Sequence, residues 1–410
     1  MPSLFEFIHP ELLAGGLGTL AVCLLLVMTK HMHGSLTMDT THGVQKFHTE
    51  PTPRVGGVPI VAGLVAAWFF APPATAKILG LMLVAGVPAF CFGLAEDLTK
   101  RVGVRERLLV SIASGALACY LNGGGLNRLD VWGLDALMLY WPMSFAFTAF
   151  AVGGVANAIN IIDGFNGLAG GVILISLCAL GLTAYAVGDA ELADLCFIVG
   201  AVTVGFLCVN FPFGKIFLGD GGAYLMGFLL AWGAVLLLVR NPSVSVWAPL
   251  LACGFPVIEV IYSIWRRRRH KLDPGSPDRL HLHSLVKLRV IMPRFKHLRP
   301  AYRNALVSPL MWAYAAIPAT LGVLFHDSTP SLIISLVICI ALYHAIYSTL
   351  ERRSSIRKEG SHQSPPIHFT GRGWAAESAP ATNQGDGLKV DFPNLDAANA
   401  AVYMKDTINN

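Results

Sequence analysis

The feature that most constrains this chain is a series of long apolar runs separated by short polar stretches. Eleven of these runs approach the ~20 residues that an α-helix needs to cross a bilayer. Only 13% of the 410 residues are charged, whereas soluble domains typically have roughly a quarter. The pattern predicts an all-α polytopic integral membrane protein with about 11 transmembrane helices. The expected spans are about 11–29, 55–71, 77–95, 106–121, 137–156, 167–187, 193–211, 219–239, 246–265, 305–325 and 331–350.

The basic residues predict the orientation of these spans. With the N-terminus outside, the inner segments hold 27 of the 30 lysines and arginines, and only Lys77, Arg128 and Arg240 lie outside. Basic residues accumulate on the cytoplasmic side of membrane proteins, so this arrangement places the C-terminus in the cytoplasm. We therefore expect a membrane-embedded domain over 1–350 and, because residues 351–410 lose the apolar pattern, a disordered cytoplasmic tail.

The most polar intramembrane stretch is Asn157–Gly171, which lies between two apolar runs at the expected cytoplasmic face. Asn157, Asn160, Asp163 and Asn166 recur every third residue, so a tight helix end places them on roughly one side. Interspersed glycines let backbone approach a ligand closely. The alternative is a packing contact between helices, built from glycine and asparagine.

Carboxylates mark two further inner segments. Glu96 and Asp97 are adjacent at the end of the third span, where paired acids suit divalent-metal binding or general-base chemistry. Asp220 stands among glycines at the start of the eighth span, where backbone N–H groups can hold phosphate and a carboxylate can hold Mg²⁺. The alternatives are a solvated helix end and a helix N-cap, respectively.

The most basic inner loop carries a run of polar side chains. Arg279, His281 and His283 are neighbours there, and such a set can bind phosphate or donate protons. A zinc site would need further ligands, and the nearby sequence offers no convincing set. Glu259, about six residues inside the ninth span, has equal claims to a structural and a functional role.

Several carboxylates and cations thus converge on one membrane face without a P-loop lysine motif or a nucleophile elbow. This combination favours Mg²⁺-assisted phosphoryl chemistry on an anionic substrate, with a lipid reaching the site from the bilayer.

The ordered motifs over about residues 40–300 resemble those of the polyprenyl-phosphate N-acetylhexosamine-1-phosphate transferase family, which is glycosyltransferase family 4. The matching motifs are PRVGG (53–57), GLAEDLTK (93–100), NAINIIDGFNGLAGG (157–171), FLGDGG (217–222) and DRLHLHS (278–284). The resemblance implies transfer of a sugar 1-phosphate from a UDP-N-acetylhexosamine to undecaprenyl phosphate, with release of UMP. It also implies a multi-pass protein of the bacterial inner membrane with its site on the cytoplasmic face.

The resemblance further implies roles for individual residues. Asp220 is expected to bind Mg²⁺, with Mn²⁺ as the alternative metal. The expected catalytic residues are Glu96, Asp97 and Asp163. The expected substrate-binding residues are Lys100, Asn160, Phe165, Asn166, Phe217, Arg279, His281 and His283. Among these, Phe217 is expected to stack on uracil, and the histidines to contact the diphosphate or the sugar.

This chain departs from the family pattern at three positions. Glu96 replaces a usual aspartate, Asn166 replaces a frequent second aspartate, and Ser284 replaces a common histidine. Because the chain lacks the three consecutive histidines typical of the muramyl-pentapeptide branch, it is similar to the branch that uses UDP-N-acetylglucosamine and initiates O-antigen, capsule or wall-polymer synthesis. Which UDP-sugar it uses, and whether transfer is direct or passes through a phospho-aspartyl enzyme, stay open.

Two other readings lead to different functions. A secondary transporter or lipid flippase would use Glu259 and Asp163 on a substrate or proton path. If the protein were a non-catalytic scaffold, the three departures from the family motifs would reflect decay of a former active site. The expected partners are the UDP-sugar, undecaprenyl phosphate and membrane lipid, with no nucleic acid and a homodimer as one candidate assembly.

Overall fold

The computed structural model describes residues 9–39, 51–271, 278 and 280–359. By their contacts the residues divide into two compact units, Met1–Gly360 and Ser361–Asn410. Helix α17 continues to Glu359, past the expected domain boundary at 350. The rest of the predicted tail lies outside the described residues.

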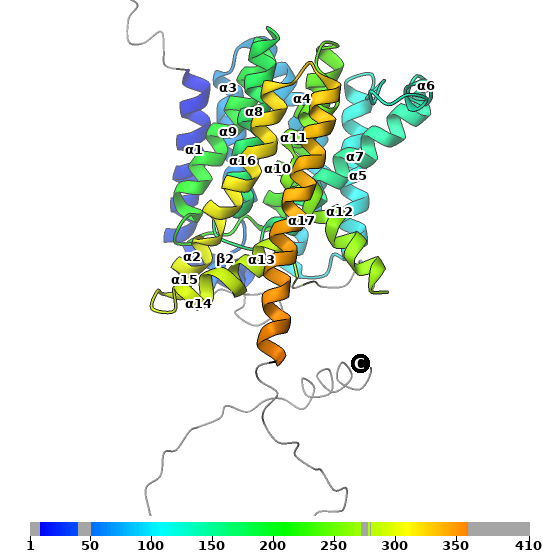
Figure 1. The fold of residues 1–410 in the computed structure, drawn as a ribbon. Helices are drawn as coiled ribbons and strands as arrows, with labels where there is room; N and C mark the ends of the chain where they lie inside the picture. Colours follow the sequence, from blue (N-terminus) through cyan, green and yellow to red (C-terminus); the bar gives the residue numbers. More distant parts are fainter. Residues whose placement is uncertain (1–8, 40–50, 272–277, 279, 360–410) are drawn as a thin grey trace, which may run out of the picture. The chain divides into compact units, whose positions relative to one another are not determined.

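Helices form nearly all of the described secondary structure (Figure 1). In chain order they are α1 Pro10–Met28, α2 Lys30–Thr37, α3 Gly57–Phe70, α4 Pro73–Thr99, α5 Val104–Leu121, α6 Leu134–Met138, α7 Trp141–Ile162, α8 Leu168–Ala186, α9 Ala190–Asn210, α10 Gly219–Arg240, α11 Trp247–Ala252, α12 Gly254–Arg269, α13 Leu282–Val286, the π-helix η2 Lys287–Ile291, α14 Met292–Arg294, α15 Pro300–Ala305, α16 Val307–Leu324 and α17 Thr329–Glu359. The described strands are β1 Met38–Asp39 and β2 Thr52–Pro53, which pair antiparallel.

The helical, polytopic architecture expected from the apolar runs is confirmed. Within the described ranges, eight helices are long and apolar enough to cross a membrane: α1, α4, α7, α8, α9, α10, the segment Pro300–Leu324 and α17 through Arg352. The other expected spans correspond to shorter or more polar helices. The second is α3, which has 14 residues, and the fourth is α5, whose first turn is charged. The ninth expected span breaks at Cys253 into α11 and α12. The count of eleven and the orientation stay predictions.

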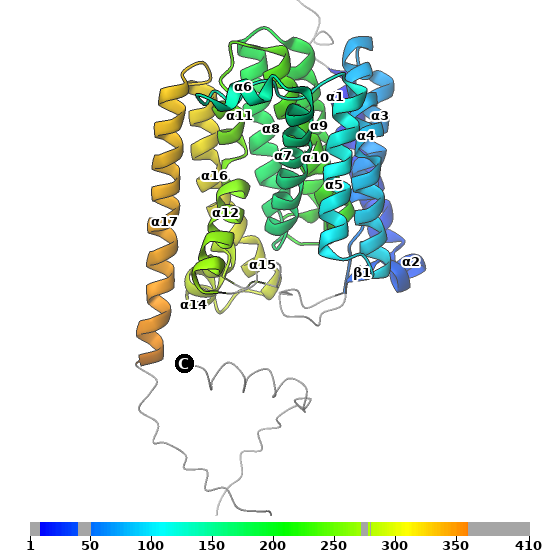
Figure 2. The same cartoon turned by 90° about the vertical axis from the view of Figure 1, so that its right-hand side faces the viewer.

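The centre of the helical unit is α10, which packs against α4, α7 and α8. Nineteen of its 22 residues are buried, including Tyr224, Phe228 and Trp232. A helix that is apolar on all sides suits this enclosed position. In Figure 2, α17 runs along one side of the unit, beside α12 and α16.

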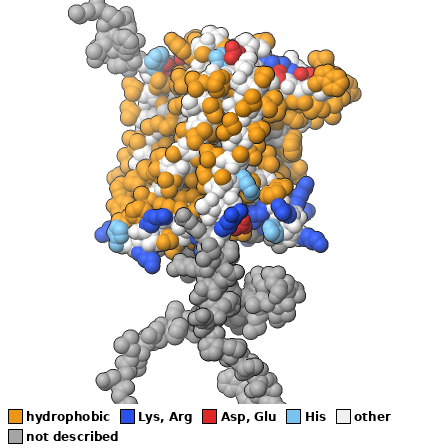
Figure 3. All heavy atoms as spheres, in the orientation of Figure 1, with side chains coloured by type: hydrophobic (Ala, Val, Ile, Leu, Met, Phe, Trp, Pro, Cys, Tyr) orange, Lys and Arg blue, Asp and Glu red, His pale blue; other side chains and the backbone are white. Residues whose placement is uncertain are grey.

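The surface of the helical unit is banded. Figure 3 shows hydrophobic side chains over its middle, while lysines and arginines gather at the end that carries α13 to α15. A lipid-facing belt between polar ends is the surface that a bilayer requires.

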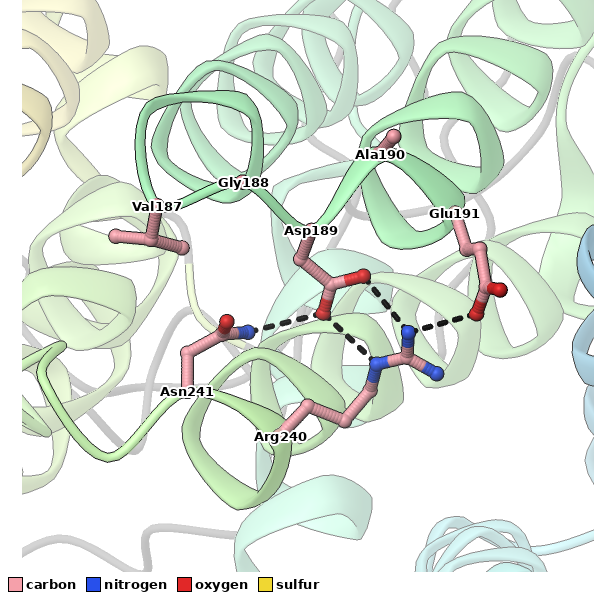
Figure 4. A pocket seen from close by; sticks show the side chains of 7 residues that line it. All are labelled: Val187, Gly188, Asp189, Ala190, Glu191, Arg240 and Asn241. Carbon is pink, nitrogen blue, oxygen red and sulfur yellow. Dashed lines mark hydrogen bonds and ion pairs between the residues drawn. The ribbon is translucent and has the colours of Figure 1, made fainter.

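An ion-pair cluster lies at the C-terminal end of α10 (Figure 4). Asp189, the N-cap of α9, accepts two hydrogen bonds of 2.8 Å from Arg240, and Arg240 also pairs with Glu191. Asn241 donates to Asp189 at 3.0 Å. Burial raises the pKa of Asp189, but hydrogen bonds from Arg240 and Asn241 outweigh it and hold that pKa below its ordinary value. The cluster ties the last turn of α10 to the start of α9.

Candidate active site

The candidate site is built around Asp220, in the first turn of α10. This side chain is 1% exposed, and Arg54 Nη2 donates to its Oδ1 at 2.5 Å. Asn160 Nδ2, from the last turn of α7, donates to the same oxygen at 3.1 Å. Arg107, from the first turn of α5, forms an ion pair with Oδ2. A buried carboxylate needs such partners, because desolvation of an unpaired charge is very costly.

Asp97, at the end of α4, holds the start of α10 in place. Its two carboxylate oxygens accept hydrogen bonds from the backbone N–H groups of Asp220 and Gly221, each at 2.9 Å. Arg54 Nε lies 3.3 Å from Asp97 Oδ1. A carboxylate at a helix N-terminus satisfies free N–H groups and interacts favourably with the helix dipole. Asp97 therefore fixes the backbone that presents Asp220.

Glycines allow three helix ends to meet backbone to backbone at this point. A Cβ on Gly93 of α4 would lie 2.6 Å from the nitrogen of Gly221, and one on Gly57 of α3 would lie 2.6 Å from that of Gly222. Gly219 has φ +73°, a conformation that favours glycine. These residues belong to three of the sequence motifs, and the structure brings them together.

Asp163 ends α7 and begins the turn before α8. Burial raises the pKa of its carboxyl to about 7, and Arg54 partly opposes the shift. The same turn is held by Asn166, whose Nδ2 donates to Pro212 O at 3.0 Å and whose carbonyl accepts from Ser308 Oγ at 2.6 Å. Asp163 is thus a carboxyl group on a well-held turn, poised to exchange a proton near neutral pH.

Aromatic and imidazole rings form a second cluster beside this turn. His281 and His283 stack at 5.3 Å between ring centroids, and Phe165 meets His283 edge-on at 5.6 Å. Glu259 Oε1 lies 3.0 Å from His281 Nδ1 and accepts the backbone N–H of Leu282 at 3.0 Å. The buried glutamate therefore orients the segment that carries both histidines.

His283 lies beside the turn that carries Asp163. A Cβ on Gly164, next to Asp163, would lie 3.6 Å from His283 Nε2. Burial lowers the pKa of His283 to about 4, although Glu259 opposes this shift, so the ring is neutral at pH 7. Its Nδ1 is buried and has no hydrogen-bond partner among the described residues. A neutral, under-satisfied ring nitrogen is suited to a hydrogen bond with a ligand.

The predicted residues thus occupy different positions in the site. Asp97 and Asn160 are both hydrogen-bonded to Asp220, and the charge of Arg54 acts electrostatically on Asp163. Glu96 turns elsewhere, because its Oε2 accepts the N–H of Val102 at 2.8 Å.

Two other predicted binding residues belong to the segments that carry Asp97 and Asp220. Lys100 is exposed and has φ 56°, and Phe217 is half-buried in the segment before α10. Arg279 lies outside the described residues. The catalytic and binding roles assigned to all of these residues stay predictions.

Three cations of the two clusters were not among the predicted site residues. Arg54 stands in PRVGG, a motif that means little alone, and Arg107 stands in the charged start of α5, where a snorkelling role is the usual expectation. Lys287, beyond the histidine motif, is 5% exposed and lies 5.2 Å from the centre of the Phe165 ring. Its position four residues after His283 was the one available signal.

Few side chains of the candidate site could bind a metal ion. Searched over the described ranges, the chain has no set of three or more His, Cys, Asp or Glu that could hold a metal ion. Mg²⁺ commonly uses one or two protein carboxylates together with substrate phosphates. Asp220 fits that pattern as a single carboxylate beside cations, which themselves favour a phosphate ligand.

A bundle of membrane-length helices with a buried, charged site at one end defines a polytopic membrane protein that is suited to an anionic ligand. Residues 79–238 match the family described as Glycosyl transferase family 4. Over this range the chain is similar to glycosyl transferase family 4, the family whose motifs the sequence resembles. The matched range contains Asp97, Asp163 and Asp220.

Curated relatives agree with the family match. The chain is 29% identical over 294 residues to the undecaprenyl-phosphate alpha-N-acetylglucosaminyl 1-phosphate transferase of Yersinia pestis, which covers 68% of this chain and 74% of that protein. It is 28% identical over 295 residues to the protein of the same name from Escherichia coli K12, covering 69% and 75%. It is 29% identical over 244 residues to a probable undecaprenyl-phosphate N-acetylglucosaminyl 1-phosphate transferase of Bacillus subtilis, covering 58% and 66%.

Proposed function

We propose that this protein transfers an N-acetylhexosamine 1-phosphate from a UDP-sugar, by default UDP-N-acetylglucosamine, to undecaprenyl phosphate and releases UMP. The observation that carries the proposal is a cluster of two buried carboxylates and two half-buried arginines, drawn from four segments to one end of a membrane bundle: Asp97, Asp220, Arg54 and Arg107. The names of the relatives support undecaprenyl phosphate as the acceptor and N-acetylglucosamine 1-phosphate as the transferred group. The reaction is a phosphoglycosyl transfer, expected at the cytoplasmic face of a bacterial inner membrane.

In this proposal the arginines receive the donor diphosphate. Arg54 and Arg107 both pair with Asp220, and guanidinium groups match phosphate oxygens with the same planar geometry that they offer to carboxylates. Mg²⁺, when bound through Asp220, would neutralise charge on the diphosphate. Asn160 keeps the Asp220 carboxylate oriented while its cationic partners turn to the donor.

The transfer step forms one bond and breaks one. An oxygen of the lipid phosphate attacks the β-phosphorus of the donor, and the bond from that phosphorus to the UMP oxygen breaks. Asp163 accepts the proton of a singly protonated lipid phosphate, and UMP leaves with the bonding electrons. A carboxyl group with a pKa of about 7 is well matched to this exchange.

Direct transfer fits the cluster better than a phospho-aspartyl intermediate. A nucleophilic carboxylate needs an oxygen free to attack phosphorus. Both oxygens of Asp97 accept backbone N–H groups, and Asp220 accepts from Asn160 and is the carboxylate assigned to Mg²⁺. We therefore assign Asp97 to positioning α10 rather than to nucleophilic attack.

The test is UMP release by purified protein in detergent, with undecaprenyl phosphate, Mg²⁺ and a panel of UDP-sugars but no ion gradient. We expect release with at least one UDP-N-acetylhexosamine and its loss in Asp220→Asn. Asp327→Asn, a carboxylate between α16 and α17, is the matched control and should keep full activity. Release that persists in a folded Asp220→Asn protein at saturating Mg²⁺ would refute the metal assignment. No release from wild type with any donor would refute the transferase.

A further inference from the structure

Lys287 is a buried cation that the proposed reaction has not yet used. It is the first residue of the π-helix η2, and its side chain is 5% exposed. Its Nζ donates a hydrogen bond to Asn304 Oδ1 at the end of α15. Single π-helical turns occur frequently at functional sites, because they shift side chains out of the regular helical register.

The ammonium group also faces the aromatic wall of the site. Lys287 Nζ lies 5.2 Å from the centre of the Phe165 ring, within the range of a cation–π interaction. The edge of Phe165 in turn meets His283, and Phe165 lies two residues after Asp163. One short chain of contacts therefore joins the lysine to both the histidines and the proposed proton acceptor.

The elements packed most closely against η2, which are α13, α14 and α15, carry basic side chains and no carboxylate. Among the elements packed against η2, α15 contributes Arg303, α14 contributes the exposed Arg294, and α13 contributes the neutral His283. Burial, and then repulsion from Arg303, lower the pKa of Lys287 to about 7. An anion placed beside these two cations would be attracted and would restore the ammonium form.

We infer that Lys287 is a further donor-binding residue, which positions Phe165 through its ring face and supplies a positive charge for the diphosphate of a UDP-sugar. This inference rests on the proposed function and extends its site across the η2 and α15 segment. Lys287 would add its charge to that of Arg54 and Arg107, which the proposed function assigns to the same diphosphate. It is therefore expected to govern donor affinity and its pH dependence more than lipid affinity.

The test compares Lys287→Met and Lys287→Arg in steady-state UMP release from pH 6 to 9, with each substrate varied in turn. Lys287→Met removes the charge and should raise KM for the UDP-sugar about 10- to 100-fold, the effect expected from loss of a charged hydrogen-bonding partner, with KM for the lipid unchanged. In wild type, kcat/KM for the donor should fall as pH rises through about 7, since the free lysine then loses its proton. Lys287→Arg stays charged and should move that fall to higher pH.

Lys215 offers a matched control on the same part of the protein. Its Nζ lies 5.6 Å from the Phe213 ring, but the side chain is exposed. Lys215→Met should leave both KM values and the pH profile at wild-type values. Melting temperatures in detergent establish that each variant is folded.

Unchanged donor KM and pH profile in folded Lys287→Met would overturn the inference. So would a parallel change in both KM values with a lower melting temperature, because that is the result of a purely structural role. Wild type without UMP release would instead refute the proposed function. In that case the thermal shift produced by UMP decides the inference: it stands if Lys287→Met loses the shift and falls if the shift is retained.

Discussion

Asp163 shows how a single residue sets a testable pH dependence. Its folded pKa of about 7 means that the carboxylate, the form that accepts a proton, predominates only above neutral pH. We therefore expect an acid limb in the kcat/KM profile, on which kcat/KM rises with pH up to about 7, while loss of the Lys287 proton produces the alkaline limb. Asp163→Asn should abolish this rise and lower kcat by ~10²–10⁴-fold, the usual contribution of a general base.

The measurement is a pH profile of UMP release for wild type and Asp163→Asn under identical conditions. Asp327→Asn serves again as a carboxylate control outside the site. A variant with normal kcat and an unaltered acid limb would assign the proton transfer to another group. Because Lys287 governs the opposite limb, Lys287→Arg and Asp163→Asn should alter different sides of the same curve.

At the scale of the element, the contact between α4 and α10 depends on Gly93. A methyl group at this position would lie 2.6–2.7 Å from backbone atoms of Asp220 and Gly221, which a rotamer change cannot move away. Gly93→Ala should therefore force the helices apart and lower the free energy of unfolding by about 1–3 kcal/mol, a typical effect of overpacking. Activity should fall further than stability, because Asp220 moves with the start of α10.

Gly154, inside α7, is the matched control for this experiment. A Cβ there would meet no atom within 4 Å, and alanine favours a helix over glycine. Gly154→Ala should keep both activity and melting temperature, as measured by UMP release and thermal unfolding in detergent. If Gly93→Ala behaves in the same way, the close contact is not a requirement of the site.

Sequence alone predicted these elements better than it predicted the contacts between them. The glycine-flanked acids at 96–97, 163 and 220 indicated that these segments meet, because a carboxylate near a membrane is costly without a role. Arg54 and Asp220 are 166 positions apart, and no local pattern records such a pairing. The role of Arg107 and the helix break at Cys253 were not predicted for a related reason. Packing between helices determines both, whereas a hydropathy pattern describes one helix at a time.

At the scale of the whole molecule, the charge distribution gives a test of orientation. Trp132 is fully exposed between α5 and α6, whereas Lys215 is exposed on the segment that leads into α10. In intact cells, a membrane-impermeant maleimide should label Trp132→Cys and leave Lys215→Cys unlabelled until the membrane is opened. The background should lack the exposed Cys91 and Cys208. The reverse labelling pattern would place the candidate site outside the cytoplasm.

The two ends of α10 are fixed by different ion pairs. Arg240 joins its last turn to Asp189, while Arg54 and Arg107 join its first turn through Asp220. Asp97 holds the start of α10 through two backbone N–H groups even when the arginines turn to the donor, so this buried helix has little freedom to slide or rotate. The opening that admits a long lipid, and the closure that excludes water, must therefore come from elements around α10.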